Sequence, residues 1–342
     1  MTTIEAKWWH TGETGRIICD LCPRHCSLNE GQKGFCEGRS VENGRLVTIM
    51  YEVSSGFCVD PVEKKPLFHF LPGSNTFSFG TASCNLGCVF CQNYAITSGQ
   101  CEEVLTEHIT AEDIAHAAVD AGCQSVSFTY NDPIISAEFT IDTAKACHKH
   151  NLRTIAVTNG YIAAGAREEF FAAMDAANID LKAFTEDFYV RQCKASLKPV
   201  LETIEYVANK TNTWLELTTL LIPGLNESTK EIDQLCSWII DHLGPNVPLH
   251  FSAFHPAHKL LDRPITPLET LLRAYEIAKS KGIHHIYLGN IHSNQGGNTN
   301  CASCATKVID RRGFAVSANK LISGKCPKCG TALAGVFTKS SP

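Results

Sequence analysis

The 342-residue sequence lacks several features that mark large classes of proteins. No uncharged apolar run approaches the roughly 20 residues that a membrane-spanning helix needs. The first ten residues also lack the apolar stretch of a signal peptide. The net charge is −5 and no basic run stands out, which argues against a broad surface for nucleic acid or an anionic membrane. We therefore expect a soluble, cytoplasmic protein with no nucleic-acid or membrane partner.

Cysteine, in contrast, is abundant, with 17 residues. In a cytoplasmic protein this abundance indicates metal binding more than disulfides. Six scattered cysteines are interpreted as small core residues without a function: Cys58, Cys101, Cys123, Cys147, Cys193 and Cys236. The other eleven form three groups: Cys19, Cys22, Cys26 and Cys36; Cys84, Cys88 and Cys91; and Cys301, Cys304, Cys326 and Cys329.

From about residue 76 the sequence alternates between strand-like and helical patterns, which predicts parallel strands joined by crossover helices. Six or seven such units fit a complete or partial (β/α) barrel, and we expect an α/β fold with a partial (β/α)6-type TIM barrel. The expected strands are 76–80, 124–130, 153–158, 178–183, 213–221, 248–254 and 283–288. The expected helices include 110–121, 134–150, 228–242 and 267–281.

The cysteine groups and this alternation together predict four parts of the chain. Residues 1–50 are rich in turns and cysteine, and they lack the apolar volume to fold without a metal or a larger neighbour. Residues 51–75 are expected to be a linker that leads into the barrel, which occupies 76–292. Residues 293–342 are expected to form a zinc-ribbon-like module, so small cysteine-rich metal modules flank the barrel at both ends.

Polar residues cluster at or just after the ends of the expected strands, where a (β/α) barrel has its active site. They are Asn131, Asp132, Thr158, Asn159, Asp180, Lys182 and Asn290. His250, His255 and His258 lie around the end of the expected sixth strand and are interpreted as structural.

The most informative group is Cys84, Cys88 and Cys91, at C-x3-C-x2-C spacing on one short loop directly after the first expected strand. A closed zinc site needs four ligands, which this loop does not supply. A 4Fe–4S cluster takes one thiolate per iron, so three thiolates leave one iron open for another molecule. The loop therefore favours a catalytic iron–sulfur cluster over zinc.

This loop, with an aromatic residue before its last cysteine, resembles the radical S-adenosylmethionine (radical SAM) superfamily. The resemblance implies that the open iron binds the amino and carboxylate groups of S-adenosylmethionine. It further implies that the reduced cluster cleaves this cofactor to a 5′-deoxyadenosyl radical, which abstracts hydrogen from a substrate. An electron donor such as a flavodoxin or ferredoxin is implied as a partner.

A wider resemblance covers nearly the whole chain. The segments 60–73, 222–226, 254–256 and 287–290, together with the flanking cysteine modules, resemble the AmmeMemoRadiSam system radical SAM enzyme family. The core of that family is similar to pyruvate formate-lyase activating enzyme. The resemblance implies an oxidoreductase and Memo-like and AMMECR-type proteins as partners, and it does not identify the substrate.

The resemblance also implies that the polar residues after the strands bind the cofactor. Asn131 and Asp132 stand where the superfamily often has a Gly-Gly-Glu element, and an Asx turn before Pro133 is the alternative for Asp132. Asp180 and Lys182 resemble the Asp-x-Lys element of glycyl-radical-activating enzymes. Thr158 and Asn159 resemble the end of their third strand, although Val157 replaces the aspartate that precedes it there.

The two flanking groups differ in what they predict. Cys301, Cys304, Cys326 and Cys329 form two C-x2-C pairs on either side of a short segment, which favours structural zinc. Four ligands in the N-terminal module imply a metal that supplies folding energy. For Cys19, Cys22, Cys26 and Cys36, zinc and an auxiliary 4Fe–4S cluster both remain open.

Three functional hypotheses follow from these observations. The first is a radical SAM enzyme that abstracts hydrogen from an unidentified substrate. The second is an activating enzyme that generates a glycyl radical on a partner protein. The third, from a different class, is a non-catalytic metal-binding adaptor, and the acidic net charge argues against the RNA-binding form of this hypothesis.

Overall fold

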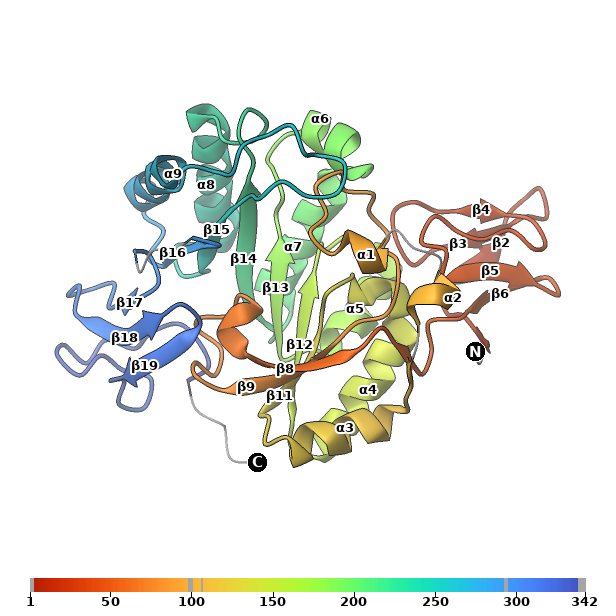
Figure 1. Cartoon of the computed structure of the whole chain (residues 1–342), viewed down its shortest axis with the longest axis horizontal. Coiled ribbons are helices and arrows are strands. Elements are labelled where there is room, and N and C mark those ends of the chain that lie inside the picture. The colour runs from red at the N-terminus through yellow and green to blue at the C-terminus, as the bar shows by residue number, and fades with distance from the viewer. Residues whose placement is uncertain (1–2, 98–100, 106, 292–294, 338–342) are drawn as a thin grey trace.

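The computed structural model describes residues 3–97, 101–105, 107–291 and 295–337. A large parallel sheet lies at the centre, with the cysteine-rich N-terminal segment on one side and the C-terminal segment on the other (Figure 1). None of the helices in these residues combines the length and the apolar character that crossing a lipid bilayer requires.

The central sheet has eight strands in the order β16-β15-β14-β13-β12-β11-β9-β8. Seven of them are parallel, and β8 pairs antiparallel with β9 at one edge. The expected α/β fold with a partial barrel is thus confirmed, and its parallel part has seven strands. The eight strands of the whole sheet are β8 (Phe57–Pro61), β9 (Asn75–Phe79), β11 (Ser125–Phe128), β12 (Arg153–Thr158), β13 (Ala176–Asp180), β14 (Trp214–Leu221), β15 (Leu249–Ala253) and β16 (Ile286–Gly289).

Helices follow the strands because amphipathic segments between them bury one face against the sheet. Thr110 caps α3 in a capping box with Asp113, and Ser228 caps α8, so both helices begin directly after these residues. The helices are α1 (Tyr94–Thr97), α2 (Cys101–Val104), α3 (Ala111–Asp120), α4 (Ala137–Lys149), α5 (Ala164–Ala172), α6 (Glu186–Phe188), α7 (Lys198–Lys210), α8 (Thr229–Leu243) and α9 (Leu268–Ser280), with short turns η1 (Val62–Lys64), η2 (Pro133–Ser136) and η3 (Tyr189–Cys193).

The segment 51–75, expected to be a linker, does more than lead into the barrel. It supplies the edge strand β8, and the residues after η1 reach the amino-terminal half of β14. There the backbone N–H groups of Phe68 and His69 donate hydrogen bonds of 3.0 and 2.7 Å to the carboxylate of Glu216. The segment therefore closes the end of the barrel opposite the cysteine loop.

Glu216 is the centre of a buried polar cluster in this closed end. His250 is the second residue of β15, near the amino end of that strand, and its Nε2 lies 2.7 Å from Glu216. His69 is hydrogen-bonded with Tyr287 at 2.6 Å. Burial raises the pKa of Glu216, but contacts with His250 and His69 outweigh it and lower the pKa to about 2.

The N-terminal residues form two small sheets, β1-β6-β5 and β2-β3-β4, beside the barrel (Figure 1). Arg39 binds them to the barrel, because its guanidinium lies 2.6 Å from the carboxylate of Glu138 in α4, with both side chains buried. The strands are β1 (Ile4–Glu5), β2 (Trp9–Thr11), β3 (Ile17–Cys19), β4 (Ser27–Leu28), β5 (Arg39–Glu42) and β6 (Arg45–Thr48), and a separate pair joins β7 (Val53–Ser54) to β10 (Glu107–His108).

The C-terminal segment contains the three-stranded sheet β17 (Thr299–Asn300), β18 (Lys307–Arg312) and β19 (Ala315–Asn319). Arg311 attaches it beneath the barrel. Its buried guanidinium donates a 2.7 Å hydrogen bond to the carbonyl oxygen of Phe68 and lies over the ring of that residue. The expected boundary between 292 and 293 lies outside the described residues, and the domain limits stay a prediction.

Candidate functional site

A pocket of about 320 Å³ opens at the carboxyl ends of the parallel strands. It contains the three cysteines of the short loop and all seven polar residues that the sequence analysis singled out after the strands. The residues brought together are Cys84, Cys88, Cys91, Asn131, Asp132, Thr158, Asn159, Asp180, Lys182 and Asn290.

The cysteine loop is held by its backbone. The N–H groups of Gly87 and Val89 donate hydrogen bonds of 2.8 and 2.9 Å to the carbonyl oxygens of Cys193 and Gln192 in η3. These two bonds fix the middle of the loop between Cys84 and Cys91. The backbone that carries the three thiols is therefore held in place by hydrogen bonds to η3.

Asn131 fixes the segment that enters the loop. Its Oδ1 accepts a 2.9 Å hydrogen bond from the backbone of Thr81, and its Nδ2 donates to the Thr81 hydroxyl and to the carbonyl oxygen of Ala82. Gly80 makes this approach possible. A β-carbon there would lie 2.5 Å from the carbonyl oxygen of Thr129 and 2.9 Å from Oδ1 of Asn131. The side chain of Asn131 thus positions the loop by holding the backbone of the residues that precede it.

The three thiols of the loop are held in a low-dielectric environment. A hydrogen bond with Cys193, followed by burial, raises the pKa of Cys88 well above its ordinary value, and burial raises the pKa of Cys84 and Cys91. Among the described residues, no group of three that includes these thiols has its sulfur atoms within 4.8 Å of one another. This spacing is wider than the sulfur spacing around one tetrahedral ion, about 3.8 Å for zinc–sulfur bonds of about 2.3 Å.

Asp132 joins the ends of two neighbouring strands. Its carboxylate accepts hydrogen bonds from the backbone of Ile134 at 3.0 Å and Asn159 at 2.7 Å, and from the hydroxyl of Thr158 at 3.0 Å. The contact with Ile134 is the Asx turn considered as the alternative for this residue. Burial raises its pKa to about 6, against the opposing effect of these donors.

Asn159 connects this network with the cysteine loop. Its Nδ2 donates a 2.8 Å hydrogen bond to Oδ1 of Asn85 and lies 3.7 Å from the sulfur of Cys84. Its Oδ1 accepts a 2.8 Å bond from the backbone of Tyr161. Thr158 and Asn159 therefore orient the first cysteine of the loop by way of Asp132 and Asn85.

Asp180 and Lys182 form an ion pair of 2.7 Å in the wall of the pocket. Asp180 is the last residue of β13 and Lys182 follows the end of that strand, and both side chains line the pocket. Burial lowers the pKa of Lys182, but the negative charge of Asp180 outweighs it, so the pKa lies well above its ordinary value. Lys182 is therefore a fixed cation next to the cysteine loop.

Asn290 lines the pocket from the turn after β16, where its φ of 57° is in the left-handed region that asparagine tolerates. Its Nδ2 donates a 3.2 Å hydrogen bond to the carbonyl oxygen of Ala253, which ties the last two strand ends together.

Sequence reasoning missed several residues of this site. Thr218 and Ser252 line the pocket, and Thr218 follows Glu216 on the inward face of β14. A polar residue at every second position of an apolar strand was the available signal. Pro66 enters the pocket from the segment after η1, and Cys193 reaches Cys88 from η3. No local pattern indicated either contact.

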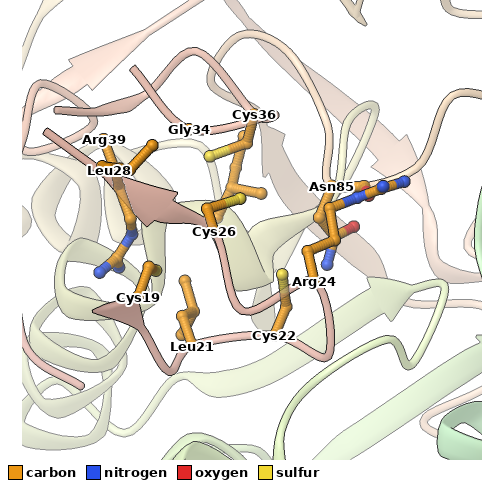
Figure 2. A pocket seen from close by; sticks show the side chains of 11 residues that line it. Cys19, Leu21, Cys22, Arg24, Cys26, Leu28, Gly34, Cys36, Arg39 and Asn85 are labelled. Atoms are coloured by element: carbon orange, nitrogen blue, oxygen red, sulfur yellow. The ribbon is translucent and has the colours of Figure 1, made fainter. Parts of the chain in front are cut away.

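The two flanking cysteine groups also come together in space. The sulfur atoms of Cys301, Cys304, Cys326 and Cys329 all lie within 4.8 Å of one another. Cys19, Cys22, Cys26 and Cys36 surround a separate cavity beside the barrel (Figure 2).

Comparison with known proteins identifies the family. Residues 79–238 match the model of the radical SAM superfamily. An uncharacterised protein of Methanocaldococcus jannaschii is 38% identical over 309 residues, which cover 90% of this chain and 91% of that protein. This chain belongs to the radical SAM superfamily. Superfamily membership implies that it is an enzyme that uses S-adenosylmethionine and a 4Fe–4S cluster.

Two further relatives of this radical SAM protein have named activities. The pyruvate formate-lyase 1-activating enzyme of Escherichia coli K12 is 25% identical over 169 residues, which cover 48% of this chain and 68% of that enzyme. A radical SAM methyltransferase structure from Sphaerobacter thermophilus aligns with a TM-score of 0.50 at 14% identity, over 86% of this chain and 78% of that one. The second likeness concerns the fold alone.

Proposed function

We propose that Cys84, Cys88 and Cys91 hold the 4Fe–4S cluster at which this protein cleaves S-adenosylmethionine and starts hydrogen abstraction from a substrate. The convergence of these three thiols with seven polar residues in one pocket of about 320 Å³ carries this proposal. Three thiolates match a four-iron cluster with one open iron. Their spacing, wider than that around a single ion, fits the same assignment.

The residues of the pocket suit the charges of S-adenosylmethionine. When bound, the cofactor and its cluster supply a 5′-deoxyadenosyl radical. Lys182 offers a cation and Asp180 a carboxylate for the carboxylate and ammonium groups of the cofactor. Asn131, Asp132, Thr158 and Asn159 have most of their polar atoms bonded within the protein, so we assign them mainly to positioning the loop and the strand ends.

The substrate class has two candidates. A small organic molecule would bind in the pocket itself. A glycine residue of a partner protein is the alternative, supported by relatives named as activating enzymes for pyruvate formate-lyase and 4-hydroxyphenylacetate decarboxylase. A flavodoxin or ferredoxin as electron donor is proposed from the superfamily, and Memo-like and AMMECR-type partners from the family resemblance alone.

The experiment is the anaerobic conversion of S-adenosylmethionine to 5′-deoxyadenosine by reduced protein. We expect the wild type and Cys58→Ala to form 5′-deoxyadenosine, because Cys58 is an exposed cysteine of β8 outside the pocket. Cys84→Ala, Cys88→Ala and Cys91→Ala together should abolish it. Undiminished activity of the triple variant would overturn the assignment. A screen for deuterium transfer from labelled candidate substrates into 5′-deoxyadenosine would then separate the two substrate classes.

We further propose structural zinc at Cys301, Cys304, Cys326 and Cys329. The sulfur atoms of Cys301 and Cys329 lie 3.6 Å apart, as do those of Cys304 and Cys326, close to the spacing of about 3.8 Å around tetrahedral zinc. Cys326→Ser should remove about one zinc ion per chain and expose the C-terminal segment to proteolysis. Cys58→Ser serves as the control, and retention of zinc by Cys326→Ser would contradict the proposal.

A further inference from the structure

The four N-terminal cysteines lie on three segments that meet at one cavity of about 20 Å³. Cys19 is the last residue of β3, Cys22 and Cys26 lie in the turn before β4, and Cys36 precedes β5. Figure 2 shows their side chains around this cavity, with apolar residues between them. Cys19 is buried and the other three are partly buried. The position of these thiols is set by the fold of the module.

The spacing of these four sulfur atoms differs from that of the C-terminal quartet. In the C-terminal quartet all four atoms lie within 4.8 Å of one another, as a single tetrahedral ion requires. In the described part of the chain, no three atoms of the N-terminal quartet meet the same limit. The two quartets of one chain therefore differ in how far apart they hold their sulfur ligands.

The cavity that the N-terminal quartet surrounds also indicates a site larger than that of a single zinc ion. Around zinc, each sulfur atom lies about 2.3 Å from the centre of the site, which leaves no room for a cavity between the thiols. A four-iron cluster also takes one thiolate per iron, but its iron and sulfide atoms stand between the ligands and hold them further apart. We propose that Cys19, Cys22, Cys26 and Cys36 bind an auxiliary 4Fe–4S cluster rather than zinc.

Arg39 supplies a buried positive charge beside this cavity. It is 1% exposed, and it lines the cavity while its Nη2 pairs with Glu138 at 2.6 Å. Within the described residues its Nε has no hydrogen-bond partner. An unpartnered buried donor is costly unless it finds an acceptor, and a cluster with thiolate and sulfide atoms offers acceptors. Hydrogen bonds to cluster sulfur atoms also raise the reduction potential of such clusters.

The cavity also lies next to the three-cysteine loop. Asn85, which follows Cys84, lines the cavity, and its carbonyl oxygen accepts a 2.5 Å hydrogen bond from Nε of Arg24. Arg24 also lines the cavity, and the carbon of its guanidinium group lies 3.4 Å from the ring centre of Phe35. The auxiliary cluster would therefore lie between the N-terminal module and the three-cysteine loop. Asn85, which lines its cavity, is the direct neighbour of Cys84 in the sequence. This is a position suited to one-electron exchange between two clusters.

The test is the metal content of protein purified anaerobically from cells supplied with iron and zinc. We expect about eight iron atoms and about one zinc ion per chain in the wild type. The variant Cys84→Ala/Cys88→Ala/Cys91→Ala should retain about four iron atoms, and its dithionite-reduced form should give the electron paramagnetic resonance signal of a reduced 4Fe–4S cluster. Because this variant leaves the N-terminal module unchanged, the result does not depend on how well a module variant folds.

The outcomes distinguish this proposal from the catalytic one. A triple variant with no iron and about two zinc ions per chain would overturn the auxiliary cluster and leave the catalytic cluster standing. Equal iron of about four atoms in the wild type and the triple variant would support the auxiliary cluster and overturn the catalytic assignment. Cys22→Ser/Cys26→Ser should lose about four iron atoms while keeping the zinc. Unchanged iron in that variant would place the iron elsewhere and overturn the proposal.

Discussion

The ammonium group of Lys182 lies 2.7 Å from a carboxylate oxygen of Asp180, in the same pocket wall as Cys88. The pair is partly buried, so its charges are weakly screened and act at short range on whatever binds in the pocket. Since neither side chain contributes to the hydrophobic core, substitutions here should affect ligand binding more than folding.

Lys182→Met should therefore lower the rate of 5′-deoxyadenosine formation at limiting cofactor by roughly 10- to 100-fold, the equivalent of one lost charge-assisted hydrogen bond. Lys145→Met, at an exposed lysine of α4, is the matched control. The rate at limiting S-adenosylmethionine and the iron content together check the prediction. An unchanged rate with unchanged iron would remove Lys182 from the binding site.

Gly80→Ala should disturb the cysteine loop without touching a thiol. The new β-carbon would meet the carbonyl oxygen of Thr129 at 2.5 Å and Asn131 at 2.9 Å, which displaces the side chain that holds Thr81. We expect a loss of stability of about 1–3 kcal/mol and reduced iron content. Gly165→Ala, in a helix with no atom within 4 Å of the added carbon, should keep both stability and iron, as measured by urea unfolding and metal analysis.

The stability of the protein should fall on mild acidification because of buried histidines under the barrel. Burial lowers the pKa of His69 to about 4 and that of His285 to about 3, so both stay neutral in the fold while the unfolded chain takes up protons from about pH 6.5. More protons bind to the unfolded state in this range, and stability must therefore decrease as the pH falls. The expected slope is about 1.4 kcal/mol per pH unit for each histidine between pH 6 and 4.

The variant His69→Gln isolates this effect from the pH dependence of the metal sites. Its free energy of unfolding, compared with that of the wild type between pH 7 and 4, should fall less steeply by about the contribution of one histidine. Parallel curves for the two proteins would show that His69 does not carry the effect.

Arg311→Met should loosen the C-terminal segment from the barrel. Arg311 donates hydrogen bonds to Phe68 and Thr299, and its Nε lies 3.4 Å from Glu63. Burial raises the pKa of Glu63 and the charge of Arg311 opposes this, so removing Arg311 leaves a buried carboxyl without its cation. We expect a loss of roughly 3 kcal/mol in urea unfolding and faster proteolysis of residues 295–337.

The double variant Arg311→Met/Glu63→Gln tests whether the two residues act together. Because it also removes the buried acid, it should recover part of the stability lost in Arg311→Met. Losses that simply add would show that Arg311 stabilises the segment through Phe68 and Thr299 alone.

The sequence alone determined the alternation of strands and helices and the spacing within each cysteine group. Apolar period and capping residues are local, so the strand Arg153–Thr158 and the helix after Thr110 could be predicted from their own residues. The C-x3-C-x2-C spacing likewise lies within one loop. Its position after the first barrel strand was enough to predict the radical SAM superfamily.

Only the tertiary structure decided how separate segments meet. The role of Asp132 in joining strand ends, the closure of the barrel under Glu216 and the contact of Cys193 with Cys88 all depend on residues distant along the chain. The choice between zinc and a cluster at Cys19, Cys22, Cys26 and Cys36 depends on distances between sulfur atoms on different turns. Those distances follow from packing against the barrel, because the spacing of residues along a chain does not determine the spacing of their side chains across loops.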